Sequence, residues 1–181
     1  MSTQASTPSR LAELIENGGA LSGFPWPRET GDYDMRIGRD GTWYYRGEPI
    51  GRKRLCQLFS TILQRDEDGV YWLVTPVERG RITVEDAPFV AVEMTSGQVL
   101  KFRTNLDHWV TADADHPISV VHNPDTGEPS PYIRFRDKLD ALISRSVFYE
   151  LVDLAEEVET ADGPRLVVRS GGESFDLGPA E

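Results

Sequence analysis

The sequence predicts an α+β protein made of two similar hairpin-helix-hairpin units that are joined by antiparallel sheet. Two segments have apolar residues at helical spacing, and strand-like segments between Gly and Asp turns flank each of them. The two halves can also be laid over each other. We therefore expect an N-terminal helix with a Pro/Trp arm (residues 1–30), a first repeat unit (31–103) and a second repeat unit (104–181).

The first unit begins with a predicted hairpin, in which Met35–Ile37 and Thr42–Arg46 flank the turn Gly38-Arg-Asp-Gly41. A helix follows the turn Gly47–Pro49. It places apolar side chains at i, i+3, i+4, i+7 and i+8, namely Leu55, Leu58, Phe59, Ile62 and Leu63. The only cysteine, Cys56, lies inside this pattern and is interpreted as a small core residue.

The middle of the chain is predicted to be mostly antiparallel sheet. Its β-branched and aromatic runs, bounded by Gly, Pro and Ser turns, are Val70–Val74, Arg81–Val84, Phe89–Met94 and Val99–Phe102. Further strands at 117–121 and 132–135 precede a second helix at about residues 144–156. At an offset of 145 − 52 = 93 residues, this helix overlays the first one and Arg145 falls on Arg52.

Arg52 and Arg145 each lie three residues before an apolar stripe position, so we expect both to continue the buried face of their helices. Arg52, Lys53 and Arg54 place three cations where a helix start already carries positive partial charge. A compensating anion is expected. One hypothesis is that Arg46, Arg52 and the turn at residues 47–51 bind a phosphate or carboxylate. The alternative is an ion pair from Arg52 to a protein carboxylate, the candidates being Glu48, Glu78, Glu85 and Asp86.

The charge of the chain is strongly acidic but uneven. The formal net charge is −11, which argues against a general nucleic-acid or anionic-membrane surface. Residues 28–65 nevertheless hold eight Lys or Arg and five Asp or Glu, a local net of +3. Such a positive segment can mark a site for a small anion or an acidic partner. The alternative is that neighbouring carboxylates neutralise it. The start of the chain lacks the features of a signal peptide, so a cytoplasmic protein is expected.

Several phrases in order resemble the bacterial family known as domain of unknown function 1285. They cover nearly all of the chain after about residue 20 and are Asp34–Gly41, Trp43–Ile50, Tyr71–Glu78, Val84–Val92 and Phe102–Asp107. The resemblance implies a two-part α+β fold with repeated motifs and a part in ligand-responsive signalling. It implies no catalytic residues. It points to polar segments at strand ends, where sites tend to lie, and so to the candidate ligand-binding residues Thr75, Glu78, Glu85, Asp86, Asn105 and Asp107.

Other chemistry finds less support in the sequence. A metal could draw on Asp107, His108, Asp113, Asp115, His116 and His122, but an extended segment would point His116 away from Asp113. No serine has the strand-turn-helix context of a nucleophile, a structural zinc site built on thiolates is excluded, and no Gly-rich phosphate loop appears. We interpret the aromatic residues Trp43, Tyr44 and Tyr45 as core rather than as a platform for nucleic acid.

The sequence therefore predicts a non-enzymatic regulatory module that binds a small anion or a protein partner, with no cofactor, no metal, no nucleic acid and no membrane. Its predicted site lies near Arg46, Arg52 and the loops around Thr75, Asp86 and Asn105. Two alternatives stay open. One is an enzyme that uses Glu78, Glu85 or Asp86 as acid or base on an anionic metabolite. The other is a structural adaptor whose tryptophans and tyrosines form a protein interface.

Overall fold

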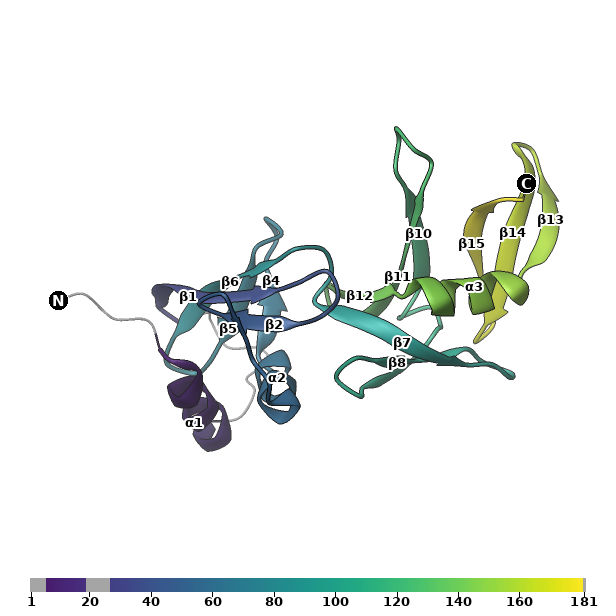
Figure 1. The fold of residues 1–181 in the computed structure, drawn as a ribbon. Helices are drawn as coiled ribbons and strands as arrows, with labels where there is room; N and C mark the ends of the chain where they lie inside the picture. The colour runs from purple at the N-terminus through teal and green to yellow at the C-terminus, as the bar shows by residue number, and fades with distance from the viewer. Residues whose placement is uncertain (1–5, 19–26, 181) are drawn as a thin grey trace. The chain divides into compact units, whose positions relative to one another are not determined.

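The structure is a computed structural model that describes residues 6–18 and 27–180. The chain forms two compact units, Met1–Asp86 and Ala87–Glu181. Both are rich in sheet and the chain has helices in each, which confirms the α+β class (Figure 1). The units meet between Asp86 and Ala87, whereas the sequence predicted the change of unit between residues 103 and 104. The predicted Pro/Trp arm around Trp26 lies outside the described residues.

The first unit is built on one six-stranded sheet with the order β3-β2-β1-β6-β5-β4. Its central strands β1 and β6 are parallel, and the other neighbours are antiparallel. The elements of this unit are α1 (Pro8–Gly18), β1 (Glu29–Ile37), β2 (Trp43–Tyr45), β3 (Glu48–Pro49), α2 (Lys53–Ser60), β4 (Leu63–Arg65), β5 (Tyr71–Val74) and β6 (Arg79–Val84).

The second unit contains a six-stranded sheet with the order β10-β11-β12-β7-β8-β9 and a three-stranded sheet with the order β13-β14-β15. In the larger sheet β7 and β12 are parallel. The elements of this unit are β7 (Phe89–Thr95), β8 (Lys101–Thr104), β9 (Trp109–Thr111), β10 (Ile118–His122), β11 (Pro129–Arg136), β12 (Leu139–Ile143), α3 (Arg145–Asp153), β13 (Glu156–Thr160), β14 (Gly163–Ser170) and β15 (Glu173–Pro179).

The two six-stranded sheets share one topology. In each, three strands lead from a central strand to one edge, and three more return from the other edge to a strand parallel to the first. The repeat predicted at an offset of 93 residues is not confirmed. Helix α2 lies between β3 and β4 within the path of the first sheet, whereas α3 follows β12 and leads into the separate three-stranded sheet. The predicted joining sheet is likewise divided, because β6 and β7 belong to different sheets.

The core of the first unit includes a contact between β2 and α2. Trp43 is 2% exposed, and its ring lies 6.1 Å from the ring of Phe59. Helix α2 ends earlier than predicted, because the N–H of Thr61 donates to the carbonyl of Leu58 (3.1 Å) and the N–H of Ile62 donates to the carbonyl of Phe59 (3.2 Å), which tightens the last turn. The apolar residues predicted for one helix are therefore divided between two elements. Leu63, the last of them, lies in β4 and is buried there.

The core of the second unit includes Phe89, which packs on Phe135 with a ring separation of 4.5 Å. Ser170, at the end of β14, ties the two sheets of this unit together. Its hydroxyl accepts a hydrogen bond from the N–H of Leu100 (2.8 Å) and donates one to the carbonyl of Ala112 (2.7 Å). Because Ser170 is buried, these two backbone groups depend on it for hydrogen bonding.

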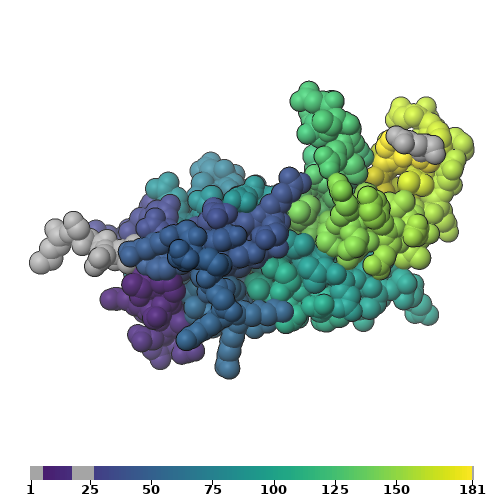
Figure 2. Space-filling view, in the orientation of Figure 1, coloured from purple at the N-terminus to yellow at the C-terminus, as the bar shows by residue number. Residues whose placement is uncertain are grey.

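The β10-β11 hairpin stands out as a separate finger of the second unit in the ribbon and in the space-filling view (Figure 1, Figure 2). Its loop is closed by Asn123, whose side-chain oxygen accepts hydrogen bonds from the N–H groups of Asp125 (2.9 Å) and Thr126 (3.1 Å). This is turn chemistry of the kind that the long Asn-Pro-Asp-Thr-Gly segment predicts.

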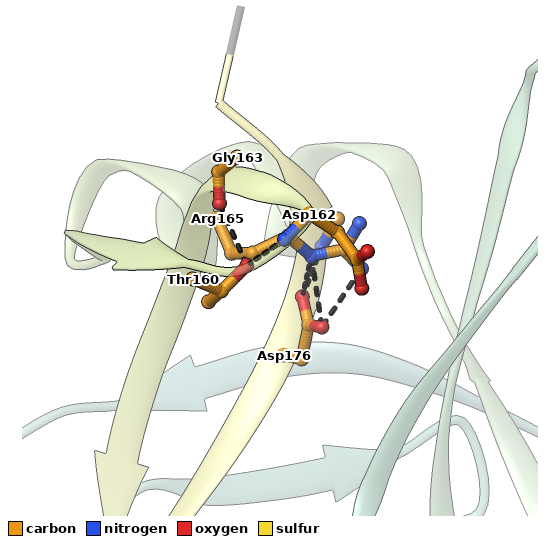
Figure 3. Close-up of polar contacts among 6 residues, drawn as sticks. Thr160, Asp162, Gly163, Arg165 and Asp176 are labelled. Atoms are coloured by element: carbon orange, nitrogen blue, oxygen red, sulfur yellow. Dashed lines mark hydrogen bonds and ion pairs between the residues drawn. The ribbon is translucent and has the colours of Figure 1, made fainter.

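The three-stranded sheet is held by side-chain contacts at its β13-β14 turn and across β14 and β15 (Figure 3). The hydroxyl of Thr160 donates to the carbonyl of Gly163 (2.7 Å) and accepts from the N–H of Asp162 (3.3 Å). The Nη2 and Nε groups of the Arg165 guanidinium donate hydrogen bonds to Asp176 Oδ2, at 2.7 and 3.0 Å, and these bonds hold the pKa of the Asp176 carboxyl below its ordinary value. These contacts stabilise the three-stranded sheet, and the charge of Arg165 is neutralised by that of Asp176.

Candidate functional site

Arg46 forms the turn of the β2-β3 hairpin together with Gly47. Its backbone is left-handed (φ 49°), and its N–H donates to the carbonyl of Asp34 at 2.9 Å. The side chain is exposed, and the guanidinium carbon lies 5.2 Å from the centre of the Tyr45 ring. Arg46 thus presents its charge to solvent from a tightly fixed backbone.

Arg52 is the N-cap residue of α2, with extended backbone (φ −95°, ψ 99°). No side chain caps the helix, and the first turn contains no acidic residue. Within the described residues, the exposed side chains of Arg52 and Arg54 make no hydrogen bond and no ion pair. Of the four carboxylates that the sequence offered as ion-pair partners, Glu48, Glu78, Glu85 and Asp86, all lie in the described part of the chain and none pairs with Arg52.

The expectation that Arg52 and Arg145 continue the buried faces of their helices is wrong. Both side chains are exposed. Arg52 precedes the first helical residue, so the three-residue spacing of a helix does not apply to it. Arg145 is the first residue of α3 and extends to Glu128 in the loop before β11, at 3.3 Å.

Thr75 and Glu78 close a tight turn between β5 and β6. The N–H and the hydroxyl of Thr75 both donate to the carbonyl of Glu78, at 2.9 and 3.0 Å, and the Thr75 hydroxyl accepts from the Glu78 N–H at 3.1 Å. The Glu78 side chain turns inward, and its residue is only 8% exposed. It accepts a hydrogen bond from the hydroxyl of Tyr33 at 2.9 Å.

Tyr33 is buried against Gly80, where a Cβ atom would lie 2.4 Å from the tyrosine ring. Burial, together with the nearby Glu78 carboxylate, raises the pKa of Tyr33 well above its ordinary value. Tyr33 therefore acts as a hydrogen-bond donor that holds a buried carboxylate. This arrangement gives Glu78 a structural partner.

Glu85 and Asp86 lie beside the β1-β2 turn. Glu85 forms an ion pair with Arg36 and accepts a hydrogen bond from the N–H of Arg39 at 3.0 Å. Asp86 forms an ion pair with the Arg39 guanidinium at 3.5 Å. The two carboxylates thus fasten the end of the first unit to its first hairpin.

Asn105 and Asp107 belong to the loop between β8 and β9 in the second unit. Asn105 exchanges hydrogen bonds with Val90: its side-chain oxygen accepts from the Val90 N–H at 3.0 Å, and its own N–H donates to the Val90 carbonyl at 2.8 Å. Asp107 has left-handed backbone (φ 65°) and pairs with Arg103 at 2.8 Å. Both side chains complete the local loop structure.

The eight predicted site residues thus fall into five places in the fold. Within the first unit the structure gives local partners to Thr75, Glu78, Glu85 and Asp86, and leaves Arg46 and Arg52 exposed. That any of the eight binds a ligand stays a prediction.

His108 is a residue whose environment the sequence did not reveal. Its ring lies 5.4 Å from the Phe135 ring and 6.2 Å from the Phe89 ring, and the buried Nδ1 has no hydrogen-bond partner among the described residues. Burial, and next the positive charge of Arg136, lower the pKa of His108, while Asp107 opposes them. The nearest signal in the sequence was the Asp107-His108 pair, which we considered only as part of a metal site.

The segment that we weighed for a metal site from its sequence, and set aside, is a turn. The Asp113 carboxylate accepts from the N–H groups of Asp115 and His116 and contacts the His116 ring at 2.9 Å, so the extended geometry that would separate His116 from Asp113 is wrong. The bond from His116 lowers the pKa of Asp113. Among residues 6–18 and 27–180, no group of three or more His, Cys, Asp or Glu side chains is placed to hold a metal ion.

Cys56 is buried on α2 and lies 3.9 Å from the carbonyl of Ile50. Burial raises the pKa of its thiol to about 11, so the thiolate is scarce at neutral pH. The interpretation as a core residue is confirmed. None of the described helices is both long enough and apolar enough to span a membrane.

Comparison with known proteins identifies two family models along the chain. Residues 25–87 match the N-terminal domain of DUF1285, a domain of unknown function, and residues 88–177 match the C-terminal domain of DUF1285, a protein of unknown function. The junction of the two models coincides within a residue with the junction of the two compact units. Among curated proteins, none matches the chain.

Two solved structures are similar. The crystal structure of a DUF1285 family protein from Silicibacter pomeroyi DSS-3 is 41% identical, covers 98% of this chain and 97% of its own, and has a TM-score of 0.82. The crystal structure of a DUF1285 family protein from Shewanella baltica OS155 is 27% identical, covers 66% of this chain and 91% of its own, and has a TM-score of 0.55.

Proposed function

The chain belongs to the DUF1285 family, and from that premise we propose that it is a non-enzymatic regulatory module that binds an anionic group through residues 46–54. We call this stretch the basic segment. It carries four cations, Arg46, Arg52, Lys53 and Arg54, and one acidic residue, Glu48, which gives a net charge of 4 − 1 = +3. All four cationic side chains are exposed.

The observation that carries the proposal is the state of Arg52. The chain holds 30 Asp and Glu residues, yet no described residue pairs with the Arg52 or Arg54 side chain. Both sit at the start of α2, where the helix dipole disfavours each cation by roughly 0.3–1 kcal/mol. A bound phosphate or carboxylate would reverse this effect, because its charge would be favourable to the dipole and to the guanidinium groups alike.

The enzyme alternative finds less support in the geometry. The three carboxylates that it named are Glu78, Glu85 and Asp86. Glu78 is bonded to Tyr33, and Glu85 and Asp86 face Arg36 and Arg39. Each of these carboxylates would have to leave its partner before it could serve as an acid or a base.

The ligand class follows from the chemistry of the basic segment. Guanidinium groups match phosphate and carboxylate oxygens with paired hydrogen bonds, so either a phosphorylated metabolite or an acidic segment of a partner protein would fit. The part in signalling that the resemblance implies, and the expected cytoplasmic location, belong to this proposal: binding of the anion would be the event that the module reports.

Thermal unfolding in the presence of inorganic phosphate, pyrophosphate and citrate at constant ionic strength tests the proposal. A probe at about 100 times its dissociation constant stabilises the folded chain by roughly 2.7 kcal/mol, which raises the melting temperature by several degrees. Arg52→Ala should abolish the shift. Lys101→Ala removes an exposed cation in the second unit and should retain it. If no probe shifts the wild-type chain, or if Arg52→Ala responds as the wild type does, the proposal is overturned.

A further inference from the structure

Strand β13 forms a free edge of the three-stranded sheet (Figure 1). Among the described strands it pairs only with β14, in an antiparallel register that sets Glu159 opposite Pro164. Proline has no N–H, and the Pro164 carbonyl accepts a hydrogen bond from the N–H of Ala180, at 3.0 Å on the side of β15. Neither backbone group of Pro164 bonds to Glu159, so the N–H and C=O of Glu159 are directed to the free edge.

Glu157 has the same orientation as Glu159, because successive residues of an antiparallel strand alternate between bonding to one neighbour and facing away from it. Val158, which lies between them, is opposite Arg165 and bonds to β14. No described residue donates to or accepts from the backbone groups of Glu157 and Glu159. The edge of β13 therefore offers unpaired N–H and C=O groups, which are a template for one further strand.

The side chains of the same two residues are also unpaired. Glu157 and Glu159 are two residues apart in a strand, so they point to the same face of the sheet. Both are exposed, and neither makes an ion pair or a side-chain hydrogen bond with a described residue. On the opposite face, Glu156 has a cation nearby, since its carboxylate lies 3.6 Å from the Arg169 guanidinium. Two uncompensated carboxylates thus lie directly beside the unpaired backbone groups.

The surroundings of β13 are strongly acidic. Residues 150–162, which include the end of α3 and all of β13, hold six acidic residues and no Lys, Arg or His, a net charge of 0 − 6 = −6. These six are Glu150, Asp153, Glu156, Glu157, Glu159 and Asp162. A negative potential of this kind attracts a cationic segment and repels an acidic one. The net charge of −11 on the whole chain acts in the same direction.

The other sheet edges among residues 6–18 and 27–180 lack this combination. β3 consists of Glu48 and Pro49, β4 has Arg65 as its one charged residue, and β9 has no charged residue. The edges β10 and β15 lie against each other, since a Cβ atom on Gly178 would be 2.9 Å from the His122 ring. The charge that could select a partner strand is therefore concentrated at β13.

We propose that β13 binds a cationic extended segment of another protein, which joins the three-stranded sheet as a fourth, antiparallel strand. Residues directly opposite each other in such a pair share a face, so cations at alternate positions of the segment meet Glu157 and Glu159. The residue between them meets Val158, which is half-buried, and an apolar or β-branched side chain suits that place. The recognised pattern is Lys-x-Lys or Arg-x-Arg with an apolar x.

A second copy of this chain is a poor occupant of the same edge. A two-fold axis at Val158 would set Glu157 of one copy opposite Glu159 of the other, and like charges directly opposite destabilise a strand pair. The basic segment is also a poor occupant, because its residues from Lys53 onward form α2 and are not extended. The occupant is therefore a different protein, and its binding does not depend on the anion proposed for the basic segment.

The test is an NMR titration of the full chain with a probe peptide, Lys-Val-Lys-Val-Lys, blocked at both ends. The control peptide is the same sequence with a methyl group on the backbone nitrogen of each lysine. It keeps every charge and every side chain, but it cannot donate the backbone hydrogen bonds that the lysines opposite Glu157 and Glu159 would make. We expect the probe peptide to shift the amide signals of β13 and the control peptide to leave them unchanged.

Two double variants separate the strand from the general acidity. Glu157→Gln with Glu159→Gln removes the two charges on β13 and keeps its backbone. Glu150→Gln with Asp153→Asn is the matched control, because it removes two exposed charges of the same acidic stretch on α3. We expect the dissociation constant of the probe peptide to rise about tenfold in the first variant and by less than about threefold in the second, as for the loss of two exposed ion pairs against weaker long-range attraction.

Amide exchange gives a second readout. The Glu157 and Glu159 amides should exchange fast in the free chain and slowly with the probe peptide, whereas the Val158 amide, which bonds to β14, stays slow in both. The proposal is overturned if the probe peptide does not bind, if the methylated peptide binds as well, or if the two double variants respond alike. Slow exchange of Glu157 and Glu159 in the concentrated chain without peptide would assign the edge to a second copy and overturn it too.

Discussion

At the scale of single residues, the polar side chains of this protein divide by whether they have a partner inside the chain. Glu78, Glu85 and Asp107 each face a donor or a cation of their own unit. Arg52 has no such partner among the described residues, and neither does the buried Nδ1 of His108. The Arg52 side chain is exposed, which favours a role in binding. The His108 ring lies among aromatic rings, so it affects the stability of the folded chain.

His108 predicts a pH dependence of stability. Burial lowers its folded-state pKa below the ordinary value of about 6.5, so near and below that pH the unfolded chain binds a proton that the folded chain does not. The stability is present above pH 6.5 and is lost as the pH falls through the folded pKa. Urea unfolding at several pH values between about 7.5 and 5 measures this slope.

The variant His108→Phe should flatten that slope, because the ring packs against Phe89 and Phe135 and an apolar side chain suits the place. His116 and His122 remain in the variant and serve as an internal control for the other histidines. An unchanged slope in His108→Phe would show that the acid sensitivity has another source.

The sequence correctly placed Arg52 and Arg145 at the starts of helices, but it predicted that their side chains are buried, whereas both are exposed. The spacing of Arg52 from the stripe was read as helical, and only the dihedral angles show that the helix begins one residue later. The polar loop residues Thr75, Asn105 and Asp107 were also correctly seen at strand ends, yet their partners come from hydrogen bonds whose formation depends on the fold. Residue type alone does not distinguish a turn from a site.

At the scale of elements, the strands and helices follow local pattern except where tertiary contacts divide a pattern. Ile62 and Leu63 extend the apolar stripe of α2, but β4 pairs with β5 and draws Leu63 into the sheet. The alternation of apolar and polar residues, together with the turn residues between strands, was sufficient to predict the antiparallel hairpins. The parallel pairs β1-β6 and β7-β12 join strands that are far apart in the chain, and no local period encodes them.

Ser170 predicts how strongly the two sheets of the second unit depend on one hydroxyl. Ser170→Ala leaves the Leu100 N–H and the Ala112 carbonyl without this partner in a buried place, at a cost of about 1–3 kcal/mol for each unsatisfied group. The free energy of unfolding in urea should fall accordingly. Ser174→Ala, on the exposed side of β15, is the matched control and should change it by less than about 0.5 kcal/mol. Equal effects of the two variants would contradict the bridging role.

At the scale of the whole molecule, the chain consists of two units whose sheets share a topology and whose boundary lies between Asp86 and Ala87. The sequence predicted two similar units but placed the boundary after residue 103, within β8. The error has a physical cause. The parallel pairing of β7 with β12 assigns β7 to the second unit, and that pairing is invisible in the sequence of β7 itself.

Fragments test this boundary. A fragment of residues 87–181 keeps both sheets of the second unit intact and should show a cooperative unfolding transition. A fragment of residues 104–181 lacks β7 and most of β8, so the larger sheet loses its central strand, and no cooperative transition is expected. If the shorter fragment unfolds as cooperatively as the longer one, the division at Asp86 does not describe the folding units.

The central claim, that the basic segment binds an anion, is tested most directly by calorimetric titration of pyrophosphate into the wild-type chain and into Arg52→Ser. Serine is a favourable N-cap residue, so the variant should gain about 1 kcal/mol of stability over the uncapped helix. We predict heat of binding for the wild type and none for the more stable Arg52→Ser, a loss that unfolding cannot explain. Equal binding by the two proteins, or no binding by the wild type, would contradict the account.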